Sequence, residues 1–306
     1  SHVQHMQKSL ALMNLQLHNV ISDITGVTGM MIIRAILNGE QDPKILAQYR
    51  DYRCKASSDT IEQSLRGHYR EEHLFCLRQA VELYDTYQQK IVACDRALEA
   101  ILKRIESHAA ACPSPLPKPR RAAKPRDNQP GFDLRTHLYR LTGVDLTQID
   151  GINSYGALKV ISEIGLDMSR WKTTKHFTSW LGLCPGNKIS GGKILNSATK
   201  RVANRAATAL RLAASSLYAS QSALGAFFRR LRARLGAPKA ITATAHKLAR
   251  LIYDMLKNRW NYHDPGLGYY EERFRGRVLK NLKHKAASLG YSLVPTVKPS
   301  PDPAVS

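Results

Sequence analysis

The sequence predicts a mainly helical protein: a helical stalk with a long coiled-coil-like helix, a proline-rich linker, and a basic helical domain with a helix-hairpin-helix-like element. Three observations predict this class. Apolar residues recur at intervals of three and four, the period of a helix face; prolines and basic residues gather in one segment; and positive charge is concentrated after that segment. These features divide the chain into a stalk at 1–110, a linker at 111–132, a domain at 133–290 and a disordered tail at 291–306.

The first apolar repeat begins almost at the N-terminus, and its spacing alternates between three and four, which predicts one helix face. Its members are Val3, Met6, Leu10, Met13, Leu17, Val20 and Ile24. We expect a single helix that Thr25-Gly26 ends. Because a domain seldom opens with such a face unless another layer precedes it, a truncated chain is expected; the alternative is an ordinary N-terminal helix that folds back on its own domain.

Two short helices are expected next. The first of them ends at Gly39, and the second begins at Asp42-Pro43. Asp can cap a helix with its carboxylate, and Pro at the first turn needs no partner for a missing N–H group.

The longest apolar repeat runs from Leu74 to Ile105. Its spacing of three and four is unbroken, and the polar residues Gln88 and Asp95 stand at a-type positions of the heptads. The pattern predicts a coiled coil that joins protomers into a homo-oligomer. It fits equally well an antiparallel arrangement in which the earlier helices of the same chain bury this face.

The segment from Pro113 to Pro130 holds six prolines and five basic side chains. Proline removes a backbone donor and restricts its neighbours, so we expect an extended linker that marks the domain boundary. Its charge fits contact with phosphates, although the linkers of basic proteins are often basic.

The chain is strongly basic: 46 Lys and Arg stand against 24 Asp and Glu, a formal net charge of +22. Such an excess is seldom found without an acidic partner, most commonly nucleic acid. Between Gly191 and Trp260 there are 14 Lys and Arg and one acid, Asp254, which indicates DNA. No apolar run has membrane-spanning length, so no membrane partner is expected. Five scattered cysteines without a zinc pattern favour a cytoplasmic protein with reduced thiols and no bound metal.

The first candidate motif is a hairpin at residues 149–157, between a short helix and a helix ended by Gly165. Gly151, Asn153 and Gly156 would let the turn present backbone N–H groups at a helix N-terminus, which suits a phosphate oxygen. This is similar to a helix-hairpin-helix element that grips the nucleic-acid backbone. The alternative is a plain connector whose glycines only satisfy the turn.

The second candidate motif is a Pro/Gly-rich loop with Ser190 at its tip. Gly191 and Gly192 would allow close approach of a substrate, and Lys188 and Lys193 would offset the charge of a phosphate. A serine here can act as a nucleophile towards a phosphodiester, provided that another group activates it. An ordinary turn serine is the alternative. The further predicted contacts to nucleic acid are Lys200, Arg201, Arg205 and Lys247.

The order of these motifs resembles that of the insertion-sequence transposases related to the Piv-type DNA invertases, the IS110 family. The Pro-x4-Ser-Gly block is the most specific part of the resemblance, which covers nearly the whole chain. The matching residues are Gln4-His5-Met6-Gln7-Lys8, Ile24-Thr25-Gly26, Arg34-Ala35-Ile36, the long heptad helix, the hairpin around Gly151, Gly182-Leu183-x-Pro185-x4-Ser190-Gly191-Gly192, Asn204-Arg205 and His246-Lys247-Leu248.

The resemblance implies a site-specific recombinase that cleaves and exchanges DNA strands through Ser190, with a structured guide RNA as a second partner. The family's serine works beside a RuvC-like domain whose four acids hold a divalent metal, so Mg²⁺ would come from that domain and not from this chain. That domain is expected to be missing, which predicts that the chain is inactive alone. The alternatives are a non-catalytic DNA-binding fragment and a helical RNA-binding scaffold.

The chain departs from the family in two ways. Its hairpin reads Asp-Gly-Ile-Asn where the family usually has Pro-Gly-Ile-Gly. Asn153 is expected to adopt the left-handed turn, whereas Asp150 would repel phosphate. The scattered acids Asp145, Asp167 and Asp254 do not predict a metal cluster.

Overall fold

The protein is mainly helical, as the sequence predicts, and within the described residues its strands are the short pair β1 and β2. The computed structural model describes residues 1–105, 115–119, 129–200 and 202–294. The chain forms two compact units, Ser1–Leu98 and Glu99–Ser306, and the boundary between them lies within the long helix at Glu71–Arg104.

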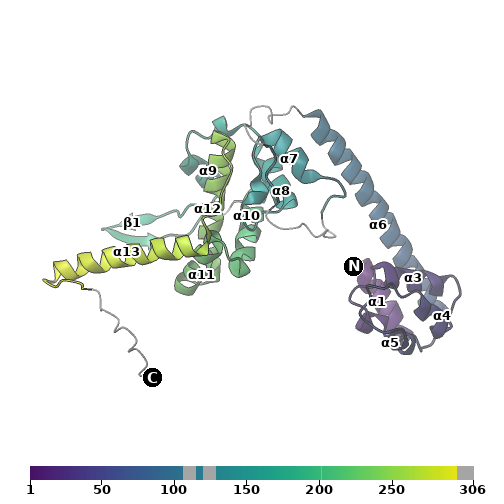
Figure 1. The fold of residues 1–306 in the computed structure, drawn as a ribbon. Helices are drawn as coiled ribbons and strands as arrows, with labels where there is room; N and C mark the ends of the chain where they lie inside the picture. Colours follow the sequence, from purple (N-terminus) through teal and green to yellow (C-terminus); the bar gives the residue numbers. More distant parts are fainter. Residues whose placement is uncertain (106–114, 120–128, 201, 295–306) are drawn as a thin grey trace, which may run out of the picture. The chain divides into compact units, whose positions relative to one another are not determined.

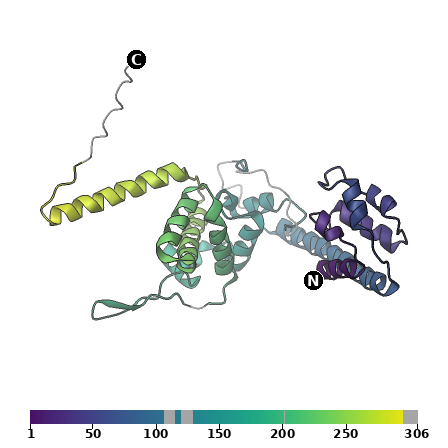
Figure 2. The ribbon, with the colours of Figure 1, turned by 90° about the horizontal axis from the view of Figure 1, so that it is seen from below.

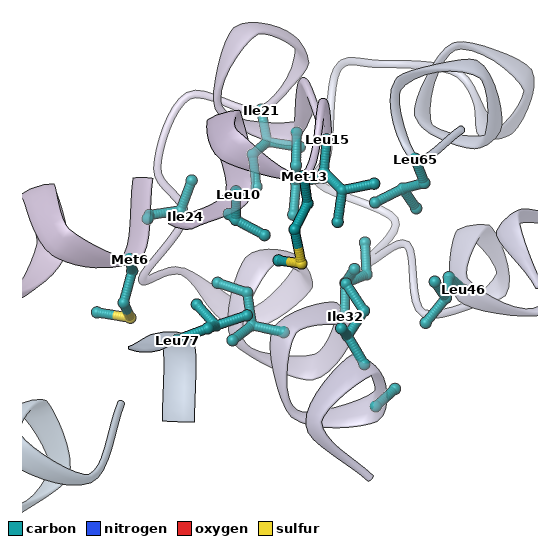
Figure 3. Close-up of a cluster of buried hydrophobic side chains, with 14 of the residues drawn as sticks. Met6, Leu10, Met13, Leu15, Ile21, Ile24, Ile32, Leu46, Leu65 and Leu77 are labelled. Carbon is teal, nitrogen blue, oxygen red and sulfur yellow. The ribbon is translucent and has the colours of Figure 1, made fainter. Parts of the chain in front are cut away.

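The first unit is an all-helical bundle (Figure 1). Its helices are α1 (His2–Leu12), α2 (Leu17–Val20), α3 (Val27–Leu37), α4 (Pro43–Gln48), α5 (Ser58–Ser64) and the first part of α6 (Glu71–Arg104). Figure 3 shows apolar side chains from these helices meeting in one core. Met6, Ile32, Leu46, Ile61 and Leu77 are 0% exposed. Each such side chain contributes about 1.5–3 kcal/mol through removal from water.

The first helix is shorter than the apolar repeat predicts. The chain reverses at Asn14, whose φ of 59° is left-handed. The N–H of Leu15 donates to the carbonyl of Leu10 at 2.9 Å, and that of Asn14 donates to Ala11 at 2.9 Å. These are the paired bonds of a Schellman C-cap. The expectation of one continuous helix up to Ile24 is therefore wrong, because the reversal brings both halves of the repeat against the same core.

The expected ends of the next two helices are confirmed. Gly39 has a φ of 100° after α3, and the N–H of Glu40 closes the cap on the carbonyl of Ala35 at 3.0 Å. Asp42 caps α4 by accepting from the N–H of Lys44 at 2.9 Å.

The long helix α6 is present where the heptad pattern predicts it. In its first part, Leu77, Ala80 and Val81 are buried in the core of the first unit. Every residue from Thr86 to Cys94, in contrast, is exposed. The first part thus fits the intrachain alternative, whereas pairing of the exposed part with a second protomer stays a prediction.

The second unit is a helical body with two projecting elements, the β1–β2 hairpin and α13, which extend from it as separate arms (Figures 1 and 2). Its 3-10 turns are η2 (Leu146–Gln148), η3 (Met168–Arg170) and η4 (Leu217–Ala219). Its helices and strands are α7 (Leu134–Thr142), α8 (Ser154–Ile164), α9 (Thr174–Trp180), β1 (Lys188–Ser190), β2 (Lys193–Asn196), α10 (Arg205–Ser216), α11 (Ala223–Leu235), α12 (Ala237–Asn258) and α13 (Gly266–Ser288).

Helix α12 lies at the centre of this body and packs against α9, α10 and α11. On its apolar face, Leu248 and Ile252 are 0% exposed. An aromatic cluster joins α12 to α9: the rings of Phe177 and Tyr253 are 5.6 Å apart, and the Tyr253 hydroxyl donates to the carbonyl of Trp171 at 2.8 Å. This packing fixes the α9 end from which the hairpin departs.

Most of the expected linker at 111–132 and the tail from residue 295 lie outside the described residues. The described piece at 115–119 is held by the second unit: Arg135 donates to the carbonyl of Pro117 at 2.6 Å, and Gln148 donates to that of Lys118 at 3.2 Å. Among the described helices, none combines the length and the apolar character that crossing a membrane requires.

Candidate nucleic-acid interface

Ser190 is the last residue of strand β1, one step before a two-residue turn. Gly191 and Gly192 have φ angles of 54° and 74°. Two positive φ values are what the tight turns of two-residue hairpins need, and glycine adopts them without strain. The expected Pro/Gly-rich loop is therefore a β-hairpin, in which Ser190 pairs with Lys193.

The register of the hairpin groups Ser190 with two lysines. Residues paired across antiparallel strands share a face, as do alternate residues of one strand. Ser190 pairs with Lys193, so these two share a face. The register is irregular between Lys188 and Ile189, where β2 has one extra residue, but Lys188 precedes Ser190 by two positions in β1, and alternation along that strand places it on the same face. All three are also exposed. Two ammonium groups beside an accessible hydroxyl form a suitable surface for a phosphate.

The stem of the hairpin is tied to the end of α9. Pro185 bridges to Thr199, and the N–H of Gly186 donates to the carbonyl of Ala198 at 2.9 Å. At Gly182, with a φ of 65°, an added Cβ would lie 2.3 Å from the side chain of Val202. The glycine of the Gly-Leu-x-Pro motif thus allows the returning strand to approach α9 closely.

An open groove of about 450 Å³ lies beside this stem, and it is lined by Thr199, Lys200, Val202, Ala203 and Arg211. Lys200 was predicted as a nucleic-acid contact, and the groove places it with Arg211, a residue that the sequence analysis missed. The predicted helix start at Asn204-Arg205 is confirmed: the Asn204 side chain accepts from the N–H of Ala207 at 3.0 Å.

The predicted hairpin at residues 149–157 packs against α10. Gly151 has a φ of 86°, and an added Cβ would lie 2.6 Å from the carbonyl oxygen of Ala213. Asn153 is extended, with a φ of −98°, and caps α8 by accepting from the N–H of Gly156 at 2.7 Å. The expectation of a left-handed Asn153 is therefore wrong, because N-cap residues take extended conformations. The N–H of Gly156 is engaged by this cap.

The turn before this hairpin is a single 3-10 turn, η2, so the likeness to a helix-hairpin-helix element stays a prediction. Asp150, expected to repel phosphate, accepts a hydrogen bond from the Ser220 hydroxyl at 3.3 Å. Asp145 caps η2 and forms a buried ion pair with Arg135. Burial raises the pKa of Asp145, but hydrogen bonds from Arg135, Thr147 and Gln148 outweigh it, and the pKa is lowered.

The segment that contains the two predicted motifs is similar to a known protein family. Residues 145–229, which include both hairpins, match the family described as Transposase IS116/IS110/IS902 family. Over these residues the chain is similar to this transposase family, and residues 145–229 are called the transposase domain below. Transposases of insertion sequences act on DNA, so DNA is the partner that this domain implies. Neither the curated proteins nor the solved structures contain a significant match to the chain.

The fold of the second unit does not gather all of the predicted contacts in one place. Ser190, Lys188, Lys193 and the two turn glycines lie together on the hairpin. Lys247 lies on α12, where its ammonium stands 4.3 Å from the ring centre of Phe227 of α11. The predicted contact at residue 201 lies outside the described residues.

The His, Cys, Asp and Glu side chains of the described residues do not form a binding site for a divalent metal. Within these residues no three His, Cys, Asp or Glu side chains lie close enough together to hold an ion. Asp145 and Asp254 are engaged elsewhere, by Arg135 and by the hydroxyl of Thr174 at 3.2 Å. No step of the chemistry can therefore be assigned to a metal held by these side chains.

Proposed function

We propose that this chain is the serine-bearing part of an insertion-sequence transposase and that Ser190 is its nucleophile. The match of residues 145–229 to the transposase family is the observation that carries the proposal. The hairpin supports it physically, since Ser190 is exposed and shares a face with Lys188 and Lys193. A buried serine, or one beside carboxylates, would not suit attack on a DNA phosphate.

In the proposed reaction the Ser190 oxygen attacks the phosphorus of a DNA phosphodiester. A bond forms between Oγ and phosphorus, the bond from phosphorus to one deoxyribose oxygen breaks, and that oxygen leaves as a free hydroxyl. The proton of Ser190 passes to a base, and the departing oxygen takes up a proton from a general acid or water to become that hydroxyl. The product is a phosphodiester that links Ser190 to the DNA, and its energy is similar to that of the original DNA phosphodiester. Attack by the hydroxyl of another strand can therefore reverse the step and exchange strands.

The base and the metal are proposed to come from outside the described residues. Lys188 and Lys193 lie on the face of the hairpin that carries Ser190, and we assign to them the binding of the phosphate; the activation of the serine is assigned to another group. We infer that a separate acidic domain of the RuvC-like type supplies Mg²⁺ to polarise the phosphate, and that this chain does not cleave DNA by itself.

Strand exchange needs more than one serine, so the proposed transposase is a homo-oligomer. The exposed part of α6 supports this proposal, because Ile91, a position of the predicted apolar seam, is 50% exposed, and its neighbours Tyr87 and Val92 are 58% and 48% exposed. Apolar side chains at heptad spacing are buried when such helices pair. A structured guide RNA is proposed as the partner that selects the DNA target.

Covalent trapping tests the proposal. The complete recombinase, with its acidic domain and Mg²⁺, is incubated with a nicked DNA target, and protein–DNA adducts are separated on a denaturing gel. Ser190→Ala is expected to abolish the adduct with DNA affinity unchanged. Ser197→Ala, at another exposed serine of the same segment, is the matched control and should form adducts normally.

Three outcomes decide between the candidate functions. Adducts that persist in Ser190→Ala show that another residue is the nucleophile. DNA binding without any adduct in the unmutated protein favours a non-catalytic DNA-binding protein. A preference for RNA over duplex DNA in competition at matched salt favours an RNA-binding scaffold.

A further inference from the structure

A second group of basic residues lies apart from the hairpin, where α11, α12 and α13 meet. It consists of Arg230, Lys247, Arg250, Arg273 and Arg277, and is referred to below as the α11–α13 cation cluster. Helix α13 packs on α11, with the rings of Phe227 and Tyr270 6.3 Å apart. The guanidinium of Arg230 lies 3.4 Å from the ring centre of Phe274. Aromatic rings therefore separate the cations and hold them in position.

These cations lack the carboxylates that would normally neutralise such a group. Within the described residues, none of the five forms an ion pair, and the two acids of α13, Glu271 and Glu272, form none either. The pKa of Lys247 is lowered by burial and by repulsion from Arg277, Arg250 and Arg273. The buried Nη1 of Arg230 has no hydrogen-bond partner in the described structure. Leaving a buried donor unsatisfied costs free energy. An anion that accepts from this donor would remove the cost, so the cluster favours an anionic partner.

The cluster continues along α13 as a line of basic side chains. Arg273, Arg277, Lys280 and His284 follow each other at spacings of four, three and four, which places them on one face of the helix. All four are exposed. At the rise of an α-helix this line is about 16 Å long. A single small anion would cover only part of it, whereas a polyanion with regularly repeated charges would cover all of it.

We propose that the α11–α13 cation cluster and the basic face of α13 bind the phosphodiester backbone of a nucleic acid, at a site separate from the serine hairpin. The inference rests on the proposed function, because the transposase domain is what makes nucleic acid the expected polyanion. It adds a contact from α13, which lies beyond the segment matched by the family and carries none of the predicted site residues. Figure 2 shows the hairpin and α13 as two separate arms, so the basic residues of each lie on different elements.

The test measures binding of the 306-residue chain to a 30-base-pair DNA duplex and to a hairpin RNA by fluorescence anisotropy, between 50 and 200 mM salt. The variant Arg273→Gln/Arg277→Gln/Lys280→Gln changes only exposed side chains, so the fold is retained. The logarithm of the affinity falls linearly with the logarithm of the salt concentration, and losing three phosphate contacts should lower the steepness of this line by about 2.7. The affinity that the variant loses between 50 and 200 mM salt is then about 40-fold smaller than the affinity that the unmutated chain loses. Affinity at 50 mM salt should fall at least about tenfold.

The matched control is Lys8→Gln/Lys44→Gln/Lys55→Gln, which removes the same charge from exposed positions of the first unit. It should bind as the unmutated chain does. A second variant, Lys247→Gln, should raise the melting temperature and lower the affinity together, since it removes a half-buried charge that its neighbours repel. A purely structural lysine would not show this combination.

The results separate the possible outcomes. If the triple variant loses affinity for DNA only, for RNA only, or for both, the result supports the site and identifies the bound polymer. An unchanged triple variant, or a control that loses as much affinity, overturns the site but leaves the proposed function standing. A chain that binds neither nucleic acid overturns both.

Discussion

The turn glycines of the serine hairpin offer a sharp test of how Ser190 is positioned. In Gly191→Ala/Gly192→Ala, two residues with φ angles of 54° and 74° acquire side chains. No atom lies within 4 Å of either added Cβ, so the cost is conformational and not steric. A left-handed L-residue costs about 1–2 kcal/mol, which gives about 2–4 kcal/mol for the pair.

That cost is large for this element. A two-stranded hairpin is only marginally stable in water, so a loss of about 2 kcal/mol reduces its population at least about thirtyfold. Unfolding of the whole domain should hardly change, because the residues from Lys188 to Lys193 are all exposed. The double variant should therefore keep its melting temperature and lose covalent adduct formation in the complete recombinase.

Two further variants complete the experiment. Gly191→Asn, which keeps Gly192, should form the adduct as the unmutated protein does, because Asn followed by Gly is favoured in this turn. Gly268→Ala changes an exposed glycine of α13 that has open space around it, so it should leave adduct formation unchanged. If the double alanine variant forms adducts at the original rate, the hairpin does not position Ser190 and the reasoning fails.

Three other predictions concern stability, each measured by urea unfolding at 25 °C. Gly151→Ala should destabilise the second unit by about 1–3 kcal/mol, because its φ of 86° is strained for alanine and α10 blocks the added Cβ; an unchanged midpoint would show that this turn is not packed on α10. Leu77→Ala should cost about 2–5 kcal/mol and Ile91→Ala under about 0.5 kcal/mol, since the side chains are 0% and 50% exposed; equal costs would mean that the exposed part of α6 is also packed. Asp145 has a lowered pKa in the folded state, so its stabilisation is complete above the usual pKa of 3.8 and is lost as the pH falls below it. Asp145→Asn should remove this acid dependence and, by leaving Arg135 without its partner, cost about 3–5 kcal/mol at pH 7; an acid profile that persists in the variant would assign the effect to another group.

The helical class and many element ends could be predicted from the sequence, because periodicity and caps are local signals. Asp42 and Gly39 show this: each satisfies backbone groups within a few residues of itself. The reversal at Asn14 was missed because both halves of the interrupted repeat face one core, so the apolar spacing continues across the break.

The candidate site was predicted less completely, and the reason lies in long-range contacts. Ser190 and its two lysines were identified from neighbouring residues, but the strand pairing that sets their common face was not. The role of Asp150 depends on Ser220, 70 positions away. Arg273 was missed because the stretch with a single acid, from Gly191 to Trp260, ends before α13, and only the fold brings that helix to α11.

The central claim is that Ser190 forms the covalent bond to DNA, and peptide mapping of the trapped adduct tests it most directly. Trypsin cleaves after Lys188 and Lys193, which releases the peptide from Ile189 to Lys193. Ser190 is the only hydroxyl-bearing residue in this peptide. After nuclease digestion of the DNA, mass spectrometry should find this peptide carrying a nucleotide phosphate. A nucleotide found on any other peptide, with this one unmodified, would contradict the account.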